Sequence, residues 1–188
     1  MRIRIGTRKS KLALWQANHV AEKLQAEGHN IKIVPIISEG DKILDTPLPL
    51  IGGKGIFTKA LDDALLNNTI DIAIHSLKDM PTELPEGISL GSILKREDPS
   101  DVIICRNGLD FLKNKTATIA TSSNRRKAQW LERYPQHKIV NIRGNIETRI
   151  KKLKESNWDA TILAAAGLIR LNLEKEIGQK LNWMLHAP

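Results

Sequence analysis

Residues 71–81, DIAIHSLKDMP, are the stretch around which the rest of this chain can be interpreted. The apolar run over residues 70–74 predicts a short strand, and an imidazole, a hydroxyl, an ammonium and a carboxylate follow it. These groups belong to His75, Ser76, Lys78 and Asp79. Ligands of open α/β sheets bind outside the carboxyl ends of the strands, so this loop is either a site or an ordinary solvated turn.

Length and composition are those of a folded globular protein. A chain of 188 residues can bury a core as one large domain or two small ones. No apolar run is long enough to cross a membrane, and the N-terminus lacks the apolar core of a secretory signal. The single cysteine, Cys105, lies in an apolar run, so we expect a buried, inert thiol and a cytoplasmic protein.

Positive charge is concentrated in one part of the chain. Residues 113–154 carry twelve Lys or Arg and only two acidic residues, a net charge of +10, whereas the whole chain is +8. Such a segment implies an anionic partner: nucleic acid, phosphate or carboxylate. Nucleic acid is disfavoured because aromatic residues are few and no helix-turn-helix or zinc-finger pattern occurs. The histidines show no metal-ligand spacing, so no metal is expected.

Hydrophobic periodicity predicts strands that alternate with helices. The expected strands cover residues 2–6, 31–37, 70–74, 89–94, 101–105, 117–120, 138–142 and 160–163. The expected helices cover residues 10–27, 57–66, 123–132, 145–155 and 165–171, with a short helix or turn at 109–113. This order indicates βαβ units and mostly parallel sheets. The charged, proline-containing segment 95–100 is the best candidate for a hinge between two lobes, residues 1–95 and 96–188.

Three of these strands end in the same way, with hydroxyl groups and arginines at the start of a helix. The groups are Thr7, Arg8 and Ser10; then Thr121, Ser122, Ser123, Arg125 and Arg126; then Arg143, Gly144, Asn145 and Arg149. A helix N-terminus offers unpaired amide donors, and an arginine fork matches a carboxylate or phosphate. At any one of these sites, an ordinary helix cap is the favoured interpretation of the hydroxyl. Three such sites, each with arginine, favour a ligand with several acidic groups.

Eight segments in register resemble the porphobilinogen deaminase (hydroxymethylbilane synthase) family and cover residues 3 to about 173. They are IGTRKSKLALWQA, GDKILDTPL, GGKGIFTKAL, DIAIHSLKDMPTELP, KREDPSDV, IATSSNRRKAQ, IRGNIETRIKKL and DATILAAAGLIRL. The resemblance implies a two-lobed α/β fold like type II periplasmic binding proteins, with mostly parallel sheets, helices on both faces and the active site in the cleft. A third domain carries a covalent dipyrromethane cofactor on a cysteine. The implied reaction condenses four porphobilinogen units head to tail into hydroxymethylbilane, releases ammonia, and serves tetrapyrrole and haem biosynthesis.

The resemblance also assigns roles to residues. Asp79 looks like the catalytic carboxylate, which stabilises the cationic azafulvene left by ammonia loss. Lys78 resembles the lysine that binds cofactor and carboxylates, and His75 and Ser76 belong to the same site. The residues that match the family's acetate- and propionate-binding set are Arg8, Ser10, Ser123, Arg125, Arg126, Arg143, Arg149 and Arg170. Thr121, Ser122 and Gly144 line the same edges, and Lys54 matches a lysine of the cleft lid.

Two departures from the family pattern shape our expectations. Ala60 stands where the family commonly has Glu. The family continues beyond residue 188 with a segment that returns to the first lobe and with the third domain, and Cys105 does not match the cofactor cysteine. We therefore expect an N-terminal fragment, monomeric in its parent, that holds no covalent cofactor and does not turn over. Its first lobe would expose a sheet edge able to pair with another copy.

Two alternatives belong to other functional classes. One is a solute-binding module that holds an organic anion without chemistry. The other is a polyanion binder driven by residues 113–154, which a steep salt dependence would reveal. A site built for pyrrole carboxylates should instead prefer porphobilinogen and the growing polypyrrole chain over DNA.

Overall fold

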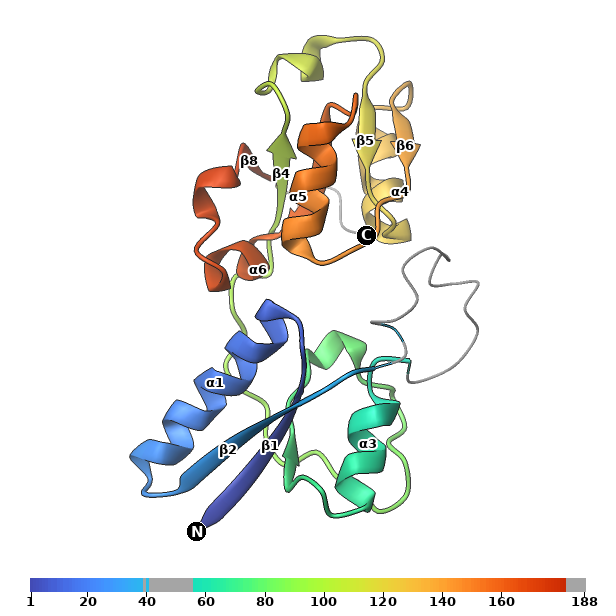
Figure 1. Cartoon of the computed structure of the whole chain (residues 1–188). Helices are drawn as coiled ribbons and strands as arrows, with labels where there is room; N and C mark the ends of the chain where they lie inside the picture. Colours follow the sequence, from blue (N-terminus) through green and yellow to red (C-terminus); the bar gives the residue numbers. More distant parts are fainter. Residues whose placement is uncertain (39, 41–55, 182–188) are drawn as a thin grey trace. The chain divides into compact units, whose positions relative to one another are not determined.

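The computed structural model describes residues 1–38, 40 and 56–181. The chain divides into two compact units, Met1–Lys95 and Arg96–Pro188, each with its own sheet and core (Figure 1). Lys54, which the sequence analysis assigned to a lid, lies outside the described residues.

The first unit is a parallel sheet with one helix on each face (Figure 1). Its elements are β1 (Arg2–Arg8), α1 (Lys11–Ala26), β2 (Asn30–Ile36), α3 (Lys59–Leu66), β3 (Ile72–Ala73) and the 3₁₀ helix η2 (Leu77–Asp79). β1 lies between β2 and β3 and is parallel to both. The helix α1 packs Ala17 and Ala21 on Ile5, whereas α3 packs Leu61 on Ile70 in a separate cluster.

Ser10 and Gly28 bound α1. The Ser10 side chain caps the helix, because its Oγ accepts a hydrogen bond from the Ala13 amide at 3.3 Å. Gly28 follows the helix with φ of 83°, a left-handed conformation that glycine adopts without a steric penalty.

Gly6 in β1 allows α3 to approach the sheet closely. A Cβ atom at Gly6 would lie 2.9 Å from Leu61 Cδ2 and would overlap Ile70. The Gly6 carbonyl also accepts a hydrogen bond from the Ile74 amide at 3.0 Å. Gly6 therefore sets the distance between α3 and the sheet. Its carbonyl also binds the end of the strand that precedes the polar loop.

The second unit is a five-stranded mixed sheet in the order β6-β5-β7-β4-β8. Its elements are β4 (Asp101–Cys105), η3 (Asp110–Lys113), β5 (Thr118–Ala120), α4 (Asn124–Arg133), β6 (Lys138–Val140), α5 (Ile146–Glu155), β7 (Ala160–Ala164), α6 (Ala165–Arg170), η4 (Glu174–Glu176) and β8 (Gln179–Leu181). Successive residues of β4 face opposite sides, as strand geometry requires. Val102 and Ile104 join the cluster of α5 and α6, while Ile103 joins Trp130 of α4.

One edge of this sheet collects the ends of several elements. β5 is parallel to β6 and to β7, so the carboxyl ends of these three strands meet at a common edge, called here the carboxyl edge. β4 is antiparallel to β7, and Asp101 at its amino end pairs with Ala164. Asp101 therefore lies at the carboxyl edge, and Cys105 lies at the opposite edge.

Several sequence predictions of structure need correction. Residues 89–94 are not a strand: no strand is assigned there, and Leu90, Ile93 and Leu94 are exposed. Apolar residues alone do not make a strand, which needs a hydrogen-bonding neighbour. β3 is shorter than the predicted strand at 70–74, and β8 was not predicted because its residues carry no apolar pattern. The sheets are mostly parallel, as predicted, and the antiparallel pairings are those of β4 with β7 and β8.

Candidate functional site

The loop after β3 presents the polar groups that the sequence analysis singled out. The Asp79 amide donates to the Ser76 carbonyl at 2.9 Å and closes η2, and Ser76 Oγ donates to Gln16 Oε1 at 3.1 Å, tying the loop to α1. Lys78 is exposed and Asp79 is half-buried. Within the described part of the chain, no side chain forms a hydrogen bond with the Asp79 carboxylate or the Lys78 ammonium. Neither charged group therefore has a counter-ion among the described residues.

His75 lies among charged groups of the same unit. Its Nε2 atom is buried and has no hydrogen-bond partner among the described residues. Burial lowers the pKa of His75; the nearby charges of Asp62 and Asp79 oppose this shift, and that of Arg8 adds to it. The net shift is downward, so the imidazole is neutral near pH 7. The sequence analysis missed Asp62, a buried residue of α3; the available signal was a carboxylate directly beside the inward-facing Leu61.

Arg8 and Ser10, which follow β1, are both engaged within the first unit. The Arg8 guanidinium carbon lies 4.3 Å from the centre of the Phe57 ring, a cation–π distance. The Ser10 hydroxyl serves as the α1 cap described above. For Ser10, the structure shows the capping role that the sequence left open.

The hydroxyl groups at the carboxyl edge build the edge itself. Ser122 Oγ donates to the Ile142 carbonyl at 2.8 Å and accepts from the Ile142 amide at 2.9 Å, so it joins the loops after β5 and β6. Thr121 Oγ1 accepts from the Ser123 amide at 3.2 Å, and Ser123 Oγ accepts from the Arg126 amide at 3.4 Å at the start of α4. Ser122 therefore ties the loop before α4 to the segment after β6, while Thr121 and Ser123 support the N-terminus of α4.

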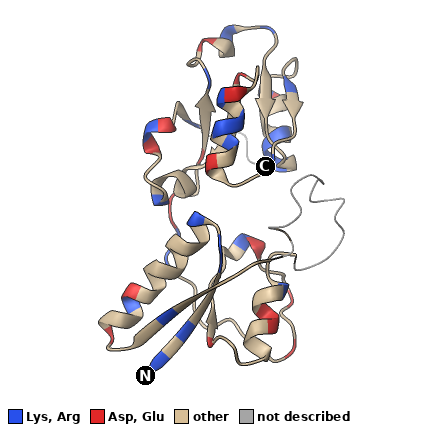
Figure 2. Cartoon of the chain, viewed as in Figure 1, with Lys and Arg blue, Asp and Glu red and all other residues tan. Residues whose placement is uncertain are grey.

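Three arginines converge at this edge. Arg149 of α5 donates from Nε to the Gly144 carbonyl at 2.8 Å. Burial lowers the pKa of Arg149, and the positive charges of Arg126 and Arg143 lower it further. Such repulsion requires the guanidinium groups to be close together, and we call Arg126, Arg143 and Arg149 the arginine cluster. Figure 2 shows basic residues on both α4 and α5. Clustered guanidiniums beside two helix N-termini form a surface that favours anions.

Gly144 allows the turn that presents Arg149. Its φ of 119° lies in the region that favours glycine, and a Cβ atom there would lie 2.6 Å from Thr148 Cγ2. The turn directs the Gly144 carbonyl to Arg149 Nε while Asn145 Oδ1 accepts from the Thr148 amide at 2.8 Å and caps α5.

A buried carboxylate lies beneath the cluster. Asp101 Oδ1 accepts from Arg126 Nη2 at 2.7 Å, and Oδ2 accepts from Arg125 Nη2 at 2.9 Å. Burial raises the pKa of Asp101, but hydrogen bonds and charges from Arg126 and Arg125 outweigh this effect, and the net shift is downward. The sequence analysis missed Asp101 because it looked like the first residue of an ordinary strand. Arg126, predicted to bind ligand carboxylates, gives two of its nitrogens to Asp101 and to the Ile162 carbonyl.

Arg170 has a different described partner from the arginine cluster. Its Nη2 atom lies 3.9 Å from Glu97 Oε1, at the start of the second unit. Arg170 is the last residue of α6, which begins directly after β7. Its assignment to a carboxylate-binding site stays a prediction.

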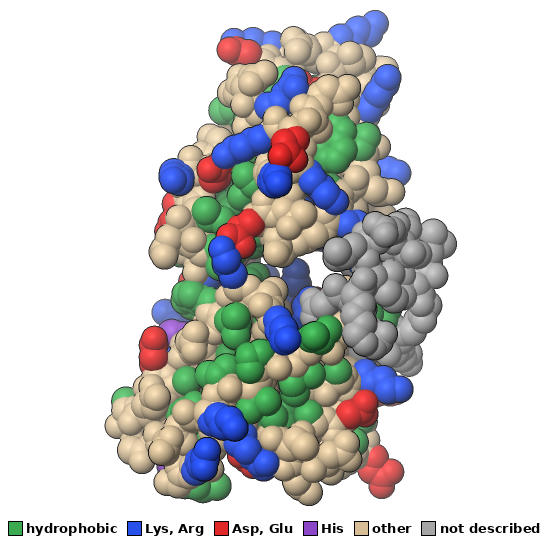
Figure 3. All heavy atoms as spheres, viewed as in Figure 1, with side chains coloured by type: hydrophobic (Ala, Val, Ile, Leu, Met, Phe, Trp, Pro, Cys, Tyr) green, Lys and Arg blue, Asp and Glu red, His purple; other side chains and the backbone are tan. Residues whose placement is uncertain are grey.

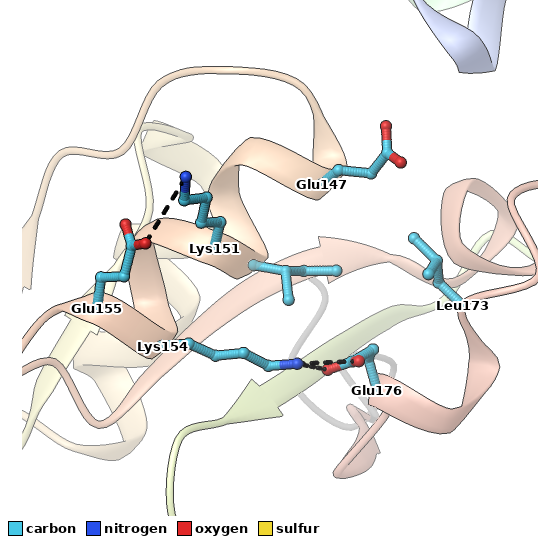
Figure 4. Close-up of a pocket in the computed structure, with 7 residues that line it drawn as sticks. Glu147, Lys151, Lys154, Glu155, Leu173 and Glu176 are labelled. Carbon is cyan, nitrogen blue, oxygen red and sulfur yellow. Dashed lines mark hydrogen bonds and ion pairs between the residues drawn. The ribbon is translucent and has the colours of Figure 1, made fainter.

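A hollow of about 360 Å³ lies elsewhere on the second unit, beside α5 and η4 (Figure 4). Its charged rim is paired, with Lys154 Nζ 2.8 Å from Glu176 Oε2 and Lys151 Nζ 3.7 Å from Glu155 Oε1. None of the predicted site residues lines it. A rim of balanced charge over an apolar floor does not suit an acidic ligand, so this hollow is not our candidate site.

Other classes of site find little support in the described residues. On the face shown in Figure 3, the Lys and Arg side chains of the second unit are interspersed with acidic and hydrophobic ones, so that face has no continuous basic track. Among residues 1–38, 40 and 56–181, no three His, Cys, Asp or Glu side chains are grouped to hold a metal ion. No helix in these ranges is long and apolar enough to cross a membrane.

The chain's single cysteine does not suit covalent attachment of a cofactor. Burial raises the pKa of Cys105 to about 11, so its thiolate is scarce at neutral pH. Cys105 packs near Gly178, at the end of β4 away from Asp101. The arginine cluster has the donor set for an acidic ligand, but Cys105 lies at the opposite edge of the sheet.

The chain is similar to known proteins over nearly its whole length. The family model described as porphobilinogen deaminase, dipyromethane cofactor binding domain, matches residues 3–188. Porphobilinogen deaminases of Geotalea uraniireducens and Trichlorobacter lovleyi are each 50% identical over 189 residues, covering 99% and 100% of this chain but 59% and 61% of theirs. The chain thus spans about 60% of the length of these curated relatives.

A solved structure identifies the fold. The periplasmic VFT2 domain of BvgS from Bordetella pertussis superposes with a TM-score of 0.52 at 13% identity, over 96% of this chain and 76% of that one. This likeness confirms the expected α/β fold of the periplasmic-binding-protein type and carries no information on function. From the family match over almost its whole length, the chain belongs to the porphobilinogen deaminase family.

Proposed function

We propose that this chain carries the catalytic carboxylate and the carboxylate-binding side chains of a porphobilinogen deaminase. The reaction joins four porphobilinogen molecules head to tail into hydroxymethylbilane and releases ammonia at each condensation. The observation that carries the proposal is the arginine cluster, in which Arg126 and Arg143 depress the pKa of Arg149. Porphobilinogen bears an acetate and a propionate group, so a growing chain of such units needs a surface of this charge.

Asp79 is the group that acts on the reacting carbon in this proposal. Loss of ammonia from the aminomethyl group leaves a cationic azafulvene, and a half-buried carboxylate stabilises such a cation more strongly than one in bulk water. Neutral His75 adds no competing positive charge beside Asp79. The exposed Lys78, adjacent in η2, is suited to bind an acidic side chain of the same substrate.

The dipyrromethane cofactor of the family, when bound, supplies the pyrrole ring to which the first substrate unit is joined. Arg143, Arg149 and Lys78 are the residues we propose to bind its carboxylates, because their charges suit acetate and propionate groups. Asp101 already engages Arg126, which we therefore place in a supporting role. Cys105 has no part in this proposal.

We further propose the organisation and setting that the family implies. Residues 1–95 and 96–188 act as two lobes, with Lys54 in a lid. The protein works as a monomer in the cytoplasm. Its partners are porphobilinogen and the growing polypyrrole chain.

Calorimetric titration of the 188-residue chain with porphobilinogen tests the proposal. R149Q removes a partly buried guanidinium from the cluster, and a lost charged hydrogen bond of about 1.5–3 kcal/mol weakens binding about 10-fold to 150-fold. The matched control is R133Q, which makes the same change in charge on the same unit but at an exposed side chain that lies over Tyr134. R133Q should bind as the unaltered chain does. Equal affinity in R149Q and R133Q, or no binding by the unaltered chain, would contradict the proposal.

A further inference from the structure

We propose that Asp101 is a positioning residue, the internal counter-ion of the carboxyl edge, which fixes Arg126 permanently and holds Arg125 until a ligand carboxylate replaces it. This inference rests on the proposed function for the identity of the ligand, a pyrrole carboxylate. It assigns to Asp101 a role that requires no contact with substrate.

The two arginines that share Asp101 are held differently. The Arg126 side chain is 13% exposed, and its second partner, at 2.9 Å, is the carbonyl of the buried Ile162. The Arg125 side chain is 58% exposed, and its second partner, at 3.1 Å, is the amide oxygen of Gln129. Arg126 is therefore locked on both sides by the protein interior, whereas Arg125 can leave Asp101 with little change in its solvation.

The charges around Asp101 explain why such a counter-ion is needed. Asp101 is 3% exposed, and its burial makes a charge tolerable only when it is paired. The positive charges of the neighbouring arginine cluster repel one another, as the lowered pKa of Arg149 indicates. A negative charge beneath Arg126 keeps that guanidinium in place when no ligand is bound. Since Arg125 and Arg126 bind different oxygens of Asp101, losing Arg125 to a ligand leaves the bond between Asp101 and Arg126 intact.

Replacement of Asp101 by a ligand carboxylate at Arg125 predicts how the affinity for the ligand changes in variants. A ligand that recruits Arg125 must first break the ion pair with Asp101. D101N weakens that pair, so binding should tighten by about twofold to fivefold, the usual strength of a half-exposed pair. The gain should disappear when Arg125 is absent, so D101N/R125Q should bind no more tightly than R125Q.

The experiment is calorimetric titration of the full chain with porphobilinogen and, as a simple dicarboxylate probe, with succinate. The four chains are the unaltered protein, D101N, R125Q and D101N/R125Q, so that the coupling between the two sites is measured directly. D110N is the matched control: it removes one negative charge from the same unit, at an exposed carboxylate paired only with Lys113 at 2.9 Å among the described residues. Circular dichroism checks that each variant is folded.

A second measurement needs no variant at Asp101. In the unaltered chain labelled with ¹⁵N, the Arg125 Nε–Hε resonance, identified by its absence in R125Q, should shift on titration while that of Arg126 stays in place. This measurement decides the matter if D101N does not fold.

The outcomes separate the two claims. A gain in D101N that depends on Arg125, together with a moving Arg125 resonance, supports the exchange. An equal gain in affinity in the R125Q background or in D110N would show a general effect of charge and would overturn the exchange. An Arg125 resonance that does not move while either ligand binds would also overturn it. So would a failure of both ligands to bind. Exchange with succinate but no binding of porphobilinogen would keep the inference and refute the proposed function.

Discussion

Gly6→Ala is the substitution whose effect follows most directly from the packing of the first unit. The added Cβ would lie 2.9 Å from Leu61 Cδ2, well inside ordinary van der Waals contact, and would overlap Ile70 as well. Both neighbours are almost completely buried, at 1% and 2% exposure, so neither can swing into solvent. The helix α3 or the strand β1 must move instead.

The cost of this movement can be estimated. Inserting one carbon into a well-packed core costs about 1–3 kcal/mol. For a unit of this size, each kcal/mol lowers the melting temperature by about 4–8 °C. A loss near 2 kcal/mol therefore lowers the melting temperature of the first unit by about 8–16 °C. Because the Gly6 carbonyl binds the Ile74 amide, the loop that carries Asp79 should also lose protection from hydrogen exchange.

Thermal unfolding followed by hydrogen exchange measures both effects, and the amides of the second unit serve as an internal reference. The matched control is Gly91→Ala, where a Cβ atom has nothing within 4 Å and φ is not positive. Gly91→Ala should change stability by no more than about 1 kcal/mol, in the stabilising direction if at all. If Gly6→Ala melts with the unaltered chain, the close packing of α3 on β1 described here is wrong.

Three further predictions concern titratable groups. Hydrogen bonds from the side chain and the backbone amide of Arg4 lower the pKa of Asp71 to about 2, and the stability this pair contributes is present above about pH 4 and lost as the pH falls through 2. In R4Q an NMR titration should show a raised Asp71 pKa that stays below its ordinary value, because the backbone amide of residue 4 still donates to Asp71 Oδ2 at 2.7 Å; an unchanged pKa contradicts the side-chain pairing. Cys105, expected to be buried, is only partly buried, but this burial raises its pKa to about 11, so the folded chain should resist alkylation by iodoacetamide at pH 8 and react once unfolded; rapid reaction in the folded state would contradict the raised pKa. The charge of Asp62 raises the pKa of His75 against the stronger effect of burial, so D62N should move the NMR titration midpoint of His75 to lower pH, and a move to higher pH would contradict their proximity.

Local patterns predicted much of the fold. Alternation and helical periodicity gave β1, α1 and β2 to within about two residues, and the capping roles of Ser10 and Ser123 follow from residue types with a strong preference for that position. The convergence of arginines at one edge was also predictable, because parallel strands carry their ends to the same side. Strand pairing was harder to predict from the sequence: residues 89–94 have strand-like composition but no neighbouring strand among the described residues.

Local sequence patterns could not predict the partners of the two buried carboxylates, Asp62 and Asp101, for a physical reason. Asp101 gains its role from Arg126, 25 residues away, and from antiparallel pairing that brings the start of β4 to the carboxyl edge. Asp62 acts on His75 from another element. Sequence periodicity reports which residues are buried, but the partner that makes a buried charge tolerable is set by tertiary structure. The division between Arg126, held by the protein, and the exposed Arg125 has the same origin.

A crystal structure of this chain with porphobilinogen tests the central claim most directly, because it shows which guanidinium groups bind the two carboxylates. We predict a carboxylate within hydrogen-bonding distance of Arg143 or Arg149, beside the N-termini of α4 and α5. Porphobilinogen bound in the hollow beside η4, or away from the carboxyl edge altogether, would contradict the assignment of the arginine cluster as the binding site.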